Sequence, residues 1–490
     1  MMKADFSTKV VLHDTARAAR ASACKALSVL ACLASFSFLP VANLSAATVP
    51  PGFAETVIAG PSASNWTEAV GVAFDGGGRM FVWERAGRVW FKDPADAGFT
   101  QLLDISEEVG DWGDYGCLGF AVDPNFRVNG YIYLLYTVDR HHLLYFGTPS
   151  YNPNSNDYNS ATIGRLTRYT CRSSDNFRSV DPASRFVLIG QTKQTGFPQC
   201  SGAHGIGSLV FGEDGTLLVS CGDGASPVDA DAGGAHSSSY APQALADGII
   251  RPKEDVGAFR AQLVDCLNGK VLRIDPLTGN GLPSNPFFDP ANPKSARSRV
   301  WALGLRNPFR MSLRPGTGSH NPDDGDPGVL YVGVVGWYTW ESLDVITRPG
   351  LNFGWPLYEG LEVAPQYPSV TPANLDAPNP LYPTTGCNQY FLFSDLLKED
   401  SLAPAAQPPF ANPCNTSQRI PSSIPQFLRA RSVLDWNQGT PSTRTPIYGA
   451  SGQALTAHVG AAGSPVSGTE FQGNCSVGGV WMRILTLLAP

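Results

Sequence analysis

Short apolar runs separated by acidic and glycine-rich turns recur along this chain, and they limit its fold more than any other feature. Residues 70–93 (VGVAFDGGGRMFVWERAGRVWFKD) alternate three apolar runs with two turns. Residues 118–137, 208–221 and 309–336 repeat the order of strand, turn and strand at uneven spacing. Such segments are typical of antiparallel hairpins. They predict an all-β fold of repeated small sheets, which favours a β-propeller over a β-sandwich or a large barrel.

The composition agrees with a chain of many short strands and tight turns. The 490 residues include 51 glycines and 40 prolines, and 16% of the residues are charged. The formal net charge is −7. Residues 1–47 hold five basic and two acidic residues, so without them the net charge moves from −7 to −10. An acidic chain without a basic run gives no electrostatic reason to expect a nucleic-acid partner.

The first 47 residues have the order of a secretory signal peptide. Several lysines and arginines precede an apolar stretch at 26–44, which ends in the small residues Ser45, Ala46 and Ala47. This pattern predicts cleavage near residue 47, a secreted or periplasmic product, and no transmembrane domain afterwards. An uncleaved membrane anchor and a lipoprotein attached at Cys32 remain alternatives.

Eight cysteines follow the predicted cleavage site. An even number in an exported chain allows up to four disulfides, but the sequence does not assign their pairing. No CxxC pair is present, so a structural zinc site is not expected. The eight are Cys117, Cys171, Cys200, Cys221, Cys266, Cys387, Cys414 and Cys475.

Three segments interrupt the strand pattern within the predicted domain at 48–490. They lie at about 145–161, 225–257 and 356–445 and are rich in proline or in small and polar residues. Segments of this kind form solvated loops, and long ones on a rigid scaffold can cover a substrate site.

A histidine and an aspartate flank the hairpin predicted at 208–221. His204 precedes its first strand and Asp223 follows its second, so antiparallel pairing should place both at the open end. A carboxylate there can hold an imidazole in one tautomer. The alternative is a polar pair that only closes the strand end.

Two further places combine residue types that suit an anionic cofactor and a cation. Arg306 and Asn307 stand just before a predicted strand, and a planar guanidinium can meet a carboxylate or a quinone oxygen with two donors. Gly336 and Trp337 lie in a tight turn whose carbonyl groups could face a Ca²⁺ ion. Packing of the arginine against the next sheet, and turn carbonyls that face water, are the simpler alternatives.

Three motifs in this order resemble the glucose/sorbosone dehydrogenase family. The first is GAHGIGSLVFGEDGTLLVSCGDG at 202–224. The second combines GKVLRIDP at 269–276 with GLRNP at 304–308. The third combines VGWYTWESLDVI at 335–346 with LNFGWP at 351–356.

The resemblance implies a six-bladed β-propeller that uses pyrroloquinoline quinone (PQQ) and calcium to oxidise a sugar at C1, and then passes electrons to an external acceptor. By the same resemblance, His204 is the catalytic base and Asp223 orients it. Arg306 and Asn307 contact PQQ, with Arg306 stabilising negative charge on the quinone oxygen. The carbonyl groups of Gly336 and Trp337 bind the calcium ion.

The chain also departs from the family pattern. Asp114 stands where the soluble glucose dehydrogenases have a glutamine on the substrate side, which makes Asp114 a candidate substrate contact. Val335, Trp337 and Ser342 replace residues usual near the calcium turn. Residues 482–490 show none of the expected repeat, so an incomplete last blade is expected. The alternative function is a propeller that binds carbohydrate or protein without turnover.

Overall fold

The computed structural model describes residues 54–61, 65–236, 238–401 and 410–481. The chain divides into two units, Met1–Ile58 and Ala59–Pro490. Only residues 54–58 of the first unit are described, and they form no helix or strand. The predicted signal peptide, Cys32 and the tail at 482–490 lie outside the described residues.

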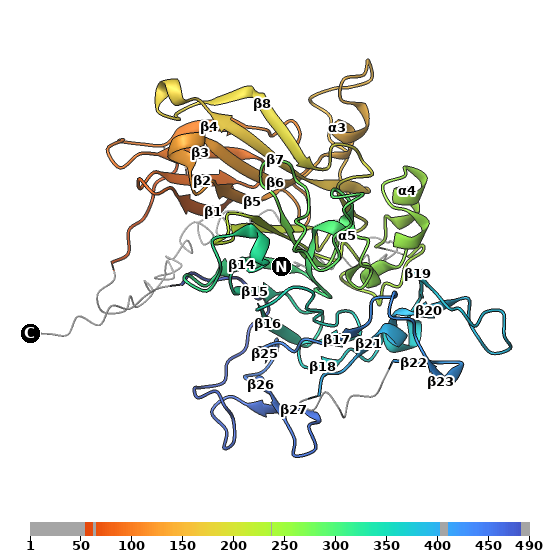
Figure 1. Ribbon diagram of the computed structural model, residues 1–490. Helices are drawn as coiled ribbons and strands as arrows, with labels where there is room; N and C mark the ends of the chain where they lie inside the picture. Colours follow the sequence, from red (N-terminus) through yellow and green to blue (C-terminus); the bar gives the residue numbers. More distant parts are fainter. Residues whose placement is uncertain (1–53, 62–64, 237, 402–409, 482–490) are drawn as a thin grey trace, which may run out of the picture. The chain divides into compact units, whose positions relative to one another are not determined.

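Mostly antiparallel strands, joined largely in chain order, make up the second unit (Figure 1). Among its named strands in the described residues, β21 (Leu397–Lys398) and β24 (Phe427–Leu428) form the parallel pair. The first sheet contains β1 (Ala69–Phe74), β2 (Met80–Glu84), β3 (Arg88–Lys92) and β4 (Thr100–Asp104). The second contains β5 (Cys117–Val122), β6 (Tyr131–Thr137), β7 (Thr162–Cys171) and β8 (Val180–Ile189), with β9 (Phe197–Gln199) paired to β7. The third contains β10 (Ile206–Phe211), β11 (Leu217–Cys221), β12 (Lys270–Ile274) and β13 (Val300–Leu303).

A fourth sheet has six strands and is interrupted by the segment at 356–433. It contains β14 (Pro308–Leu313), β15 (Leu330–Val334), β16 (Trp340–Ile346), β25 (Leu434–Asn437), β26 (Thr443–Tyr448) and β27 (Ala454–His458). The interrupting segment holds the disulfide between Cys387 and Cys414. Its short strands are β17 (Tyr358–Glu359), β18 (Glu362–Val363), β19 (Ala373–Pro378), β20 (Tyr390–Leu392), β21 (Leu397–Lys398), β22 (Ala411–Asn412), β23 (Asn415–Arg419) and β24 (Phe427–Leu428).

Helices in the described residues are short. The α-helices are α2 (Phe126–Asn129), α3 (Arg140–Tyr145), α4 (Ala241–Ala246) and α5 (Ala296–Arg299). The 3-10 helices are η1 (Ser173–Asp175), η2 (Pro252–Glu254), η3 (Gly257–Ala261), η4 (Pro322–Asp324), η5 (Pro368–Val370) and η6 (Phe393–Leu396). None of the described helices is both long enough and apolar enough to span a bilayer.

The order of the sheets is that of propeller blades. The first strands of successive sheets contact one another: β1 contacts β5, β5 contacts β10, and β10 contacts β14. Each sheet then continues outward through its later strands, as in a blade. The all-β prediction is therefore confirmed. The number of six blades is not confirmed, because the described residues form four large sheets.

Apolar side chains pack between neighbouring sheets. Phe81 and Trp83 on β2 pack against Phe120 on β5, with ring centroids 5.7 and 5.3 Å apart. Leu135 on β6 and Ile206 on β10 belong to the next buried cluster along the series. This burial of apolar surface between sheets is the main source of stability for such a fold, and it fixes the ends of the strands that carry the candidate site.

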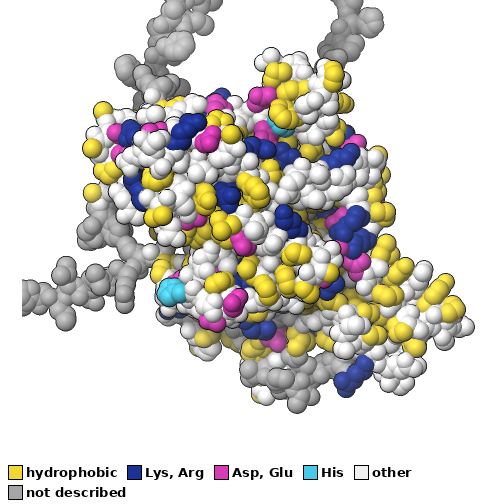
Figure 2. All heavy atoms as spheres, turned by 45° about the horizontal axis from the view of Figure 1, so that its top comes forward, with side chains coloured by type: hydrophobic (Ala, Val, Ile, Leu, Met, Phe, Trp, Pro, Cys, Tyr) yellow, Lys and Arg dark blue, Asp and Glu magenta, His cyan; other side chains and the backbone are white. Residues whose placement is uncertain are grey.

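Charged side chains of both signs are mixed on the surface. On the face shown in Figure 2, basic and acidic side chains lie among hydrophobic and uncharged ones and do not gather by sign.

Candidate active site

The hairpin that was predicted to carry His204 and Asp223 is the pair β10 and β11. Near the turn, Phe211 pairs with Leu217, whereas at the open end Ile206 pairs with Cys221. A shift in register lies between these pairs, at residues 206–209. This bulge moves the open end by one residue. The bulge thereby brings His204 opposite Asp223. Without it, continuous pairing from the turn would place the two residues one position out of register.

His204 and Asp223 are joined by a hydrogen bond. The distance between His204 Nδ1 and Asp223 Oδ1 is 2.9 Å, and both side chains are buried. Because a carboxylate accepts, Nδ1 carries the proton and Nε2 keeps its lone pair. Nε2 has no partner among the described residues and is not sealed from solvent. This arrangement suits a general base, and the predicted dyad geometry is present.

The backbone at the dyad is tightly constrained. His204 has φ of 54°, a left-handed conformation that is uncommon for a residue with a side chain and recurs at functional sites. Its carbonyl accepts a hydrogen bond from Gly224 N at 2.9 Å. A Cβ on Gly222 would lie 2.5 Å from the same carbonyl oxygen, so this close approach requires glycine.

Asp223 has further partners that sequence reasoning missed. Trp355 Nε1 donates to Asp223 Oδ2 at 2.7 Å, and Ala225 N donates to Oδ1 at 2.9 Å. Burial raises the pKa of Asp223, but its interaction with His204, the nearby charge of Arg306 and the hydrogen bond from Ala225 N outweigh this effect and hold the pKa below its usual value. The carboxylate therefore stays ionised and fixes the imidazole. Trp355 lies in the LNFGWP motif, so the sequence marked this residue as part of a family motif but did not indicate that it contacts Asp223.

Arg306 lies at the same end of the third sheet. The Asp223 amide donates to the Arg306 carbonyl at 2.8 Å, and the guanidinium carbon lies 5.4 Å from the centre of the Trp355 ring. Arg306 Nη1 donates to the carbonyl groups of Val335 and Gly336 at 3.1 and 2.5 Å. The side chain is buried, and Nε has no partner. Burial lowers the pKa of Arg306, and no carboxylate of the described chain forms a salt bridge with it.

The turn at Gly336 and Trp337 is organised by a glutamate. Glu359 Oε1 accepts hydrogen bonds from four successive amides, those of residues 337–340, at 2.7 to 3.2 Å. The amides of the turn therefore face Glu359, and the Gly336 carbonyl faces Arg306. Asn307 is buried beside them, and its carbonyl accepts from Val335 N at 3.0 Å.

Asp114 lies beside the loop that carries the histidine. Its amide donates to the Gly202 carbonyl at 3.2 Å, and its side chain is exposed. The buried Tyr115 hydroxyl donates to the Ser201 carbonyl and, at 3.3 Å, to the Ala203 carbonyl. Asp114 is thus near enough to the dyad loop to stay a candidate for a substrate contact.

The surroundings of Arg306 fit an anionic cofactor. The charge of Asp223 offsets part of the cost of burying Arg306, but Arg306 Nε has no hydrogen-bond partner. A carboxylate or quinone oxygen could accept its unused donors. PQQ carries such groups. A cavity of about 20 Å³ touches Arg306, Gly336 and Asp344. It has room for about one water, so a quinone would have to meet Arg306 outside this cavity.

Calcium fits less well. The Gly336 carbonyl accepts from Arg306, which leaves it a poor ligand for a cation in this arrangement. In the part of the chain that is described, no group of three or more His, Cys, Asp or Glu residues could hold a metal ion. The two turn carbonyls do not form a calcium site by themselves.

A buried carboxyl near Arg306 should make stability depend on pH. Asp344 is 2% exposed, its Oδ1 has no hydrogen-bond partner, and burial raises its pKa to about 7. A raised pKa means that Asp344 contributes stability at low pH, which is lost as the pH rises through about 7. Asp344→Asn should therefore stabilise the protein, relative to the parent chain, by about 4 kcal/mol more at high than at low pH, since the pKa is raised by about three units and each unit corresponds to about 1.4 kcal/mol. Urea unfolding at both pH values measures this, and an equal difference at both would contradict it.

A family model described as "Glucose / Sorbosone dehydrogenase" matches residues 66–377. The chain belongs to this family. The match covers the first three sheets and the strands that carry His204, Asp223, Arg306 and the turn at Gly336. It confirms the resemblance drawn from the motifs.

Several known proteins are similar to this member of the glucose/sorbosone dehydrogenase family. HIPL2 protein of Arabidopsis thaliana is 26% identical over 311 residues, which are 58% of this chain and 40% of that protein. Quinoprotein glucose dehydrogenase B of Acinetobacter calcoaceticus is 25% identical over 289 residues, 58% of this chain and 48% of that protein. The chain thus spans less than half the length of these relatives. The PQQ-bound aldose sugar dehydrogenase of Streptomyces coelicolor covers 83% of this chain and 84% of its own, at 17% identity and a TM-score of 0.41.

Proposed function

We propose that this chain is an exported oxidoreductase that oxidises an aldose or a related sugar at C1 to the lactone, with PQQ as hydride acceptor. The observation that carries the proposal is the buried dyad of His204 and Asp223, next to a buried arginine, Arg306, whose Nε has no hydrogen-bond partner. Membership of the glucose/sorbosone dehydrogenase family supports the same reaction class. An external electron acceptor would complete the cycle.

In this proposal His204, Asp223 and Arg306 have different roles in the oxidation. His204 Nε2 takes the proton of the C1 hydroxyl, and Asp223 holds the imidazole in the tautomer that leaves Nε2 free. The ionised Asp223 also stabilises the imidazolium that forms. Arg306 places a positive charge where negative charge develops on the acceptor. When bound, PQQ supplies the electrophilic carbon that accepts the hydride.

Arg306 would need to change partners in the working enzyme. Its Nη1 now donates to the Val335 and Gly336 carbonyl groups. A guanidinium that left these two carbonyl groups could turn its donors to the cofactor, and Asn307 beside it would offer an amide.

Cofactor binding tests the proposal. We expect saturable binding when the calcium-loaded full chain is titrated with PQQ and followed by the quinone absorbance. Arg306→Gln should weaken this binding by about tenfold or more, since a charge-assisted contact is lost. Arg310→Gln, on β14, is the matched control and should bind as the parent chain does. Absence of binding by the parent chain would contradict the proposal and favour a propeller that binds carbohydrate or protein without turnover.

A further inference from the structure

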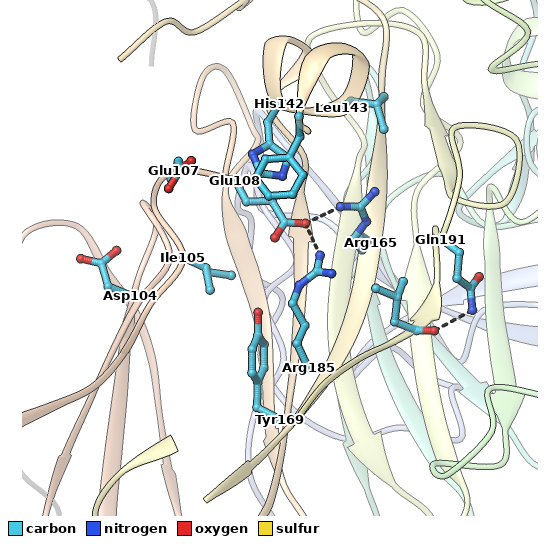
Figure 3. Close-up of a pocket in the computed structure, with 12 residues that line it drawn as sticks. Asp104, Ile105, Glu107, Glu108, His142, Leu143, Arg165, Tyr169, Arg185 and Gln191 are labelled. Atoms are coloured by element: carbon cyan, nitrogen blue, oxygen red, sulfur yellow. Dashed lines mark hydrogen bonds and ion pairs between the residues drawn. The ribbon is translucent and has the colours of Figure 1, made fainter. Parts of the chain in front are cut away.

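A second cavity lies apart from the dyad centre, which is formed by His204, Asp223 and Arg306. This cavity lies where the end of β4 and the following segment meet β7, β8 and α3 (Figure 3). Its volume is about 480 Å³, within the range of small-molecule sites. No residue of the dyad centre lines it. Its lining residues come from 104–108 and 142–146, from β7 and β8, and from Gln191.

Glu108 is the central polar group of this cavity. Its Oε1 accepts hydrogen bonds from the Tyr136 hydroxyl and Arg185 Nη2, both at 2.7 Å, and from Arg165 Nη1. Figure 3 shows the two guanidinium groups converging on this oxygen. Oε2 has no hydrogen-bond partner among the described residues. Burial raises the pKa of Glu108, but the two arginines outweigh it and lower the pKa, so an ionised acceptor oxygen remains available.

Other lining groups can donate or accept. His142 Nδ1 lies 3.0 Å from the Tyr151 hydroxyl, and burial lowers the pKa of His142, which keeps the ring neutral with Nε2 uncommitted. The Tyr169 hydroxyl and the Gln191 side chain also line the cavity. The Phe146 ring, 62% exposed, adds an apolar face at its rim.

The charges of the cavity do not favour an anion. Three carboxylates, those of Asp104, Glu107 and Glu108, outnumber the two guanidinium groups of Arg165 and Arg185. Both guanidinium groups are already bound to Glu108. An acceptor oxygen, several donors and an aromatic ring within one small cavity instead match neighbouring hydroxyl groups on a carbon ring, which donate and accept at once.

We propose that this cavity binds a neutral polyhydroxylated molecule of monosaccharide to disaccharide size, separately from the dyad centre. Vicinal hydroxyl groups would donate to Glu108 Oε2 and exchange hydrogen bonds with His142 and Tyr169, while an apolar sugar face packs on Phe146. The site does not depend on PQQ or on turnover.

Binding of sugars that cannot be oxidised at C1 tests this inference. The probes are methyl β-D-glucopyranoside and sorbitol, added to the full chain and followed by calorimetry or by ligand-observed NMR. Tyr169→Phe and Phe146→Ala should each weaken binding by about fivefold, the loss expected for one hydrogen bond or one ring contact. Glu108 is kept, because its loss would leave two arginines without their partner. Phe186→Ala, at an exposed position on β8 outside the cavity, should leave binding unchanged, as should His204→Ala.

Three results would overturn the inference. These are absence of binding by both probes, loss of binding in His204→Ala, which would move the site to the dyad, and displacement of the probes by inorganic phosphate, which would make it an anion site. Failure of the PQQ titration would leave these results unaffected, so the two proposals can fail separately.

Discussion

His204→Ala is expected to lower kcat for sugar oxidation by about 10²- to 10⁴-fold, the usual contribution of a general base. The reason is geometric. His204 Nδ1 is held by Asp223 at 2.9 Å, which leaves Nε2 as the base of the dyad. When His204 is replaced, none of the described residues that contact Asp223 is a histidine that could take the proton instead. Steady-state turnover of the PQQ-loaded chain with an aldose measures the loss.

Binding of the cofactor separates a chemical role of His204 from a structural one. PQQ affinity should change little in His204→Ala, because the cofactor contacts are assigned to Arg306 and Asn307. The matched control is His458→Ala, at a histidine that is 56% exposed and lies on β27 away from the dyad. Full turnover in His204→Ala would contradict the assignment of the base.

Arg273→Met is expected to lower the free energy of unfolding by about 3–5 kcal/mol, because it strands a buried carboxylate. Arg273 on β12 pairs with Asp214 in the turn between β10 and β11 at 2.7 Å, and both side chains are fully buried. Arg273 Nη1 also donates to Ser284 and Asn285. The pair therefore fixes the turn of the hairpin whose other end carries the dyad. Denaturant unfolding measures the change.

An exposed ion pair provides the control for this prediction. Arg172 and Asp181 lie 3.6 Å apart, each with a side chain 46% exposed. Arg172→Met should cost under about 1 kcal/mol, because water screens such pairs. If Arg273→Met destabilised the chain no more than Arg172→Met, the buried pair would not hold the hairpin as argued.

Local pattern was enough to predict the strands and the dyad. Alternation of apolar runs with glycine and acidic turns depends on near neighbours, so β1 to β3, β5 with β6, and β10 with β11 were expected from sequence. The facing of His204 and Asp223 was also expected, but its cause was not. The ladder near the turn is offset by one residue, and the bulge at 206–209 restores the pairing.

Contacts between distant segments could not be predicted in the same way. Trp355 meets Asp223 across 132 positions of sequence, and Arg165 meets Glu108 across 57. Nothing in either local stretch specifies the partner. The hydrogen bond from Arg306 to the Gly336 carbonyl likewise depends on how the third and fourth sheets pack. The number of six blades was predicted from the family resemblance alone. The long segment between β16 and β25 interrupts the repeat of strands in the sequence, so the blades could not be counted from strand spacing.

Reduction of PQQ by sugar is the most direct test of the central claim, that the dyad takes part in oxidation at C1. The PQQ-loaded, calcium-loaded chain is mixed without oxygen with a panel of aldoses, each with hydrogen or deuterium at C1, while the quinone absorbance is followed. We expect at least one aldose to bleach the quinone, and to do so more slowly when C1 carries deuterium, because that bond breaks. A quinone absorbance that no aldose changes would contradict the account.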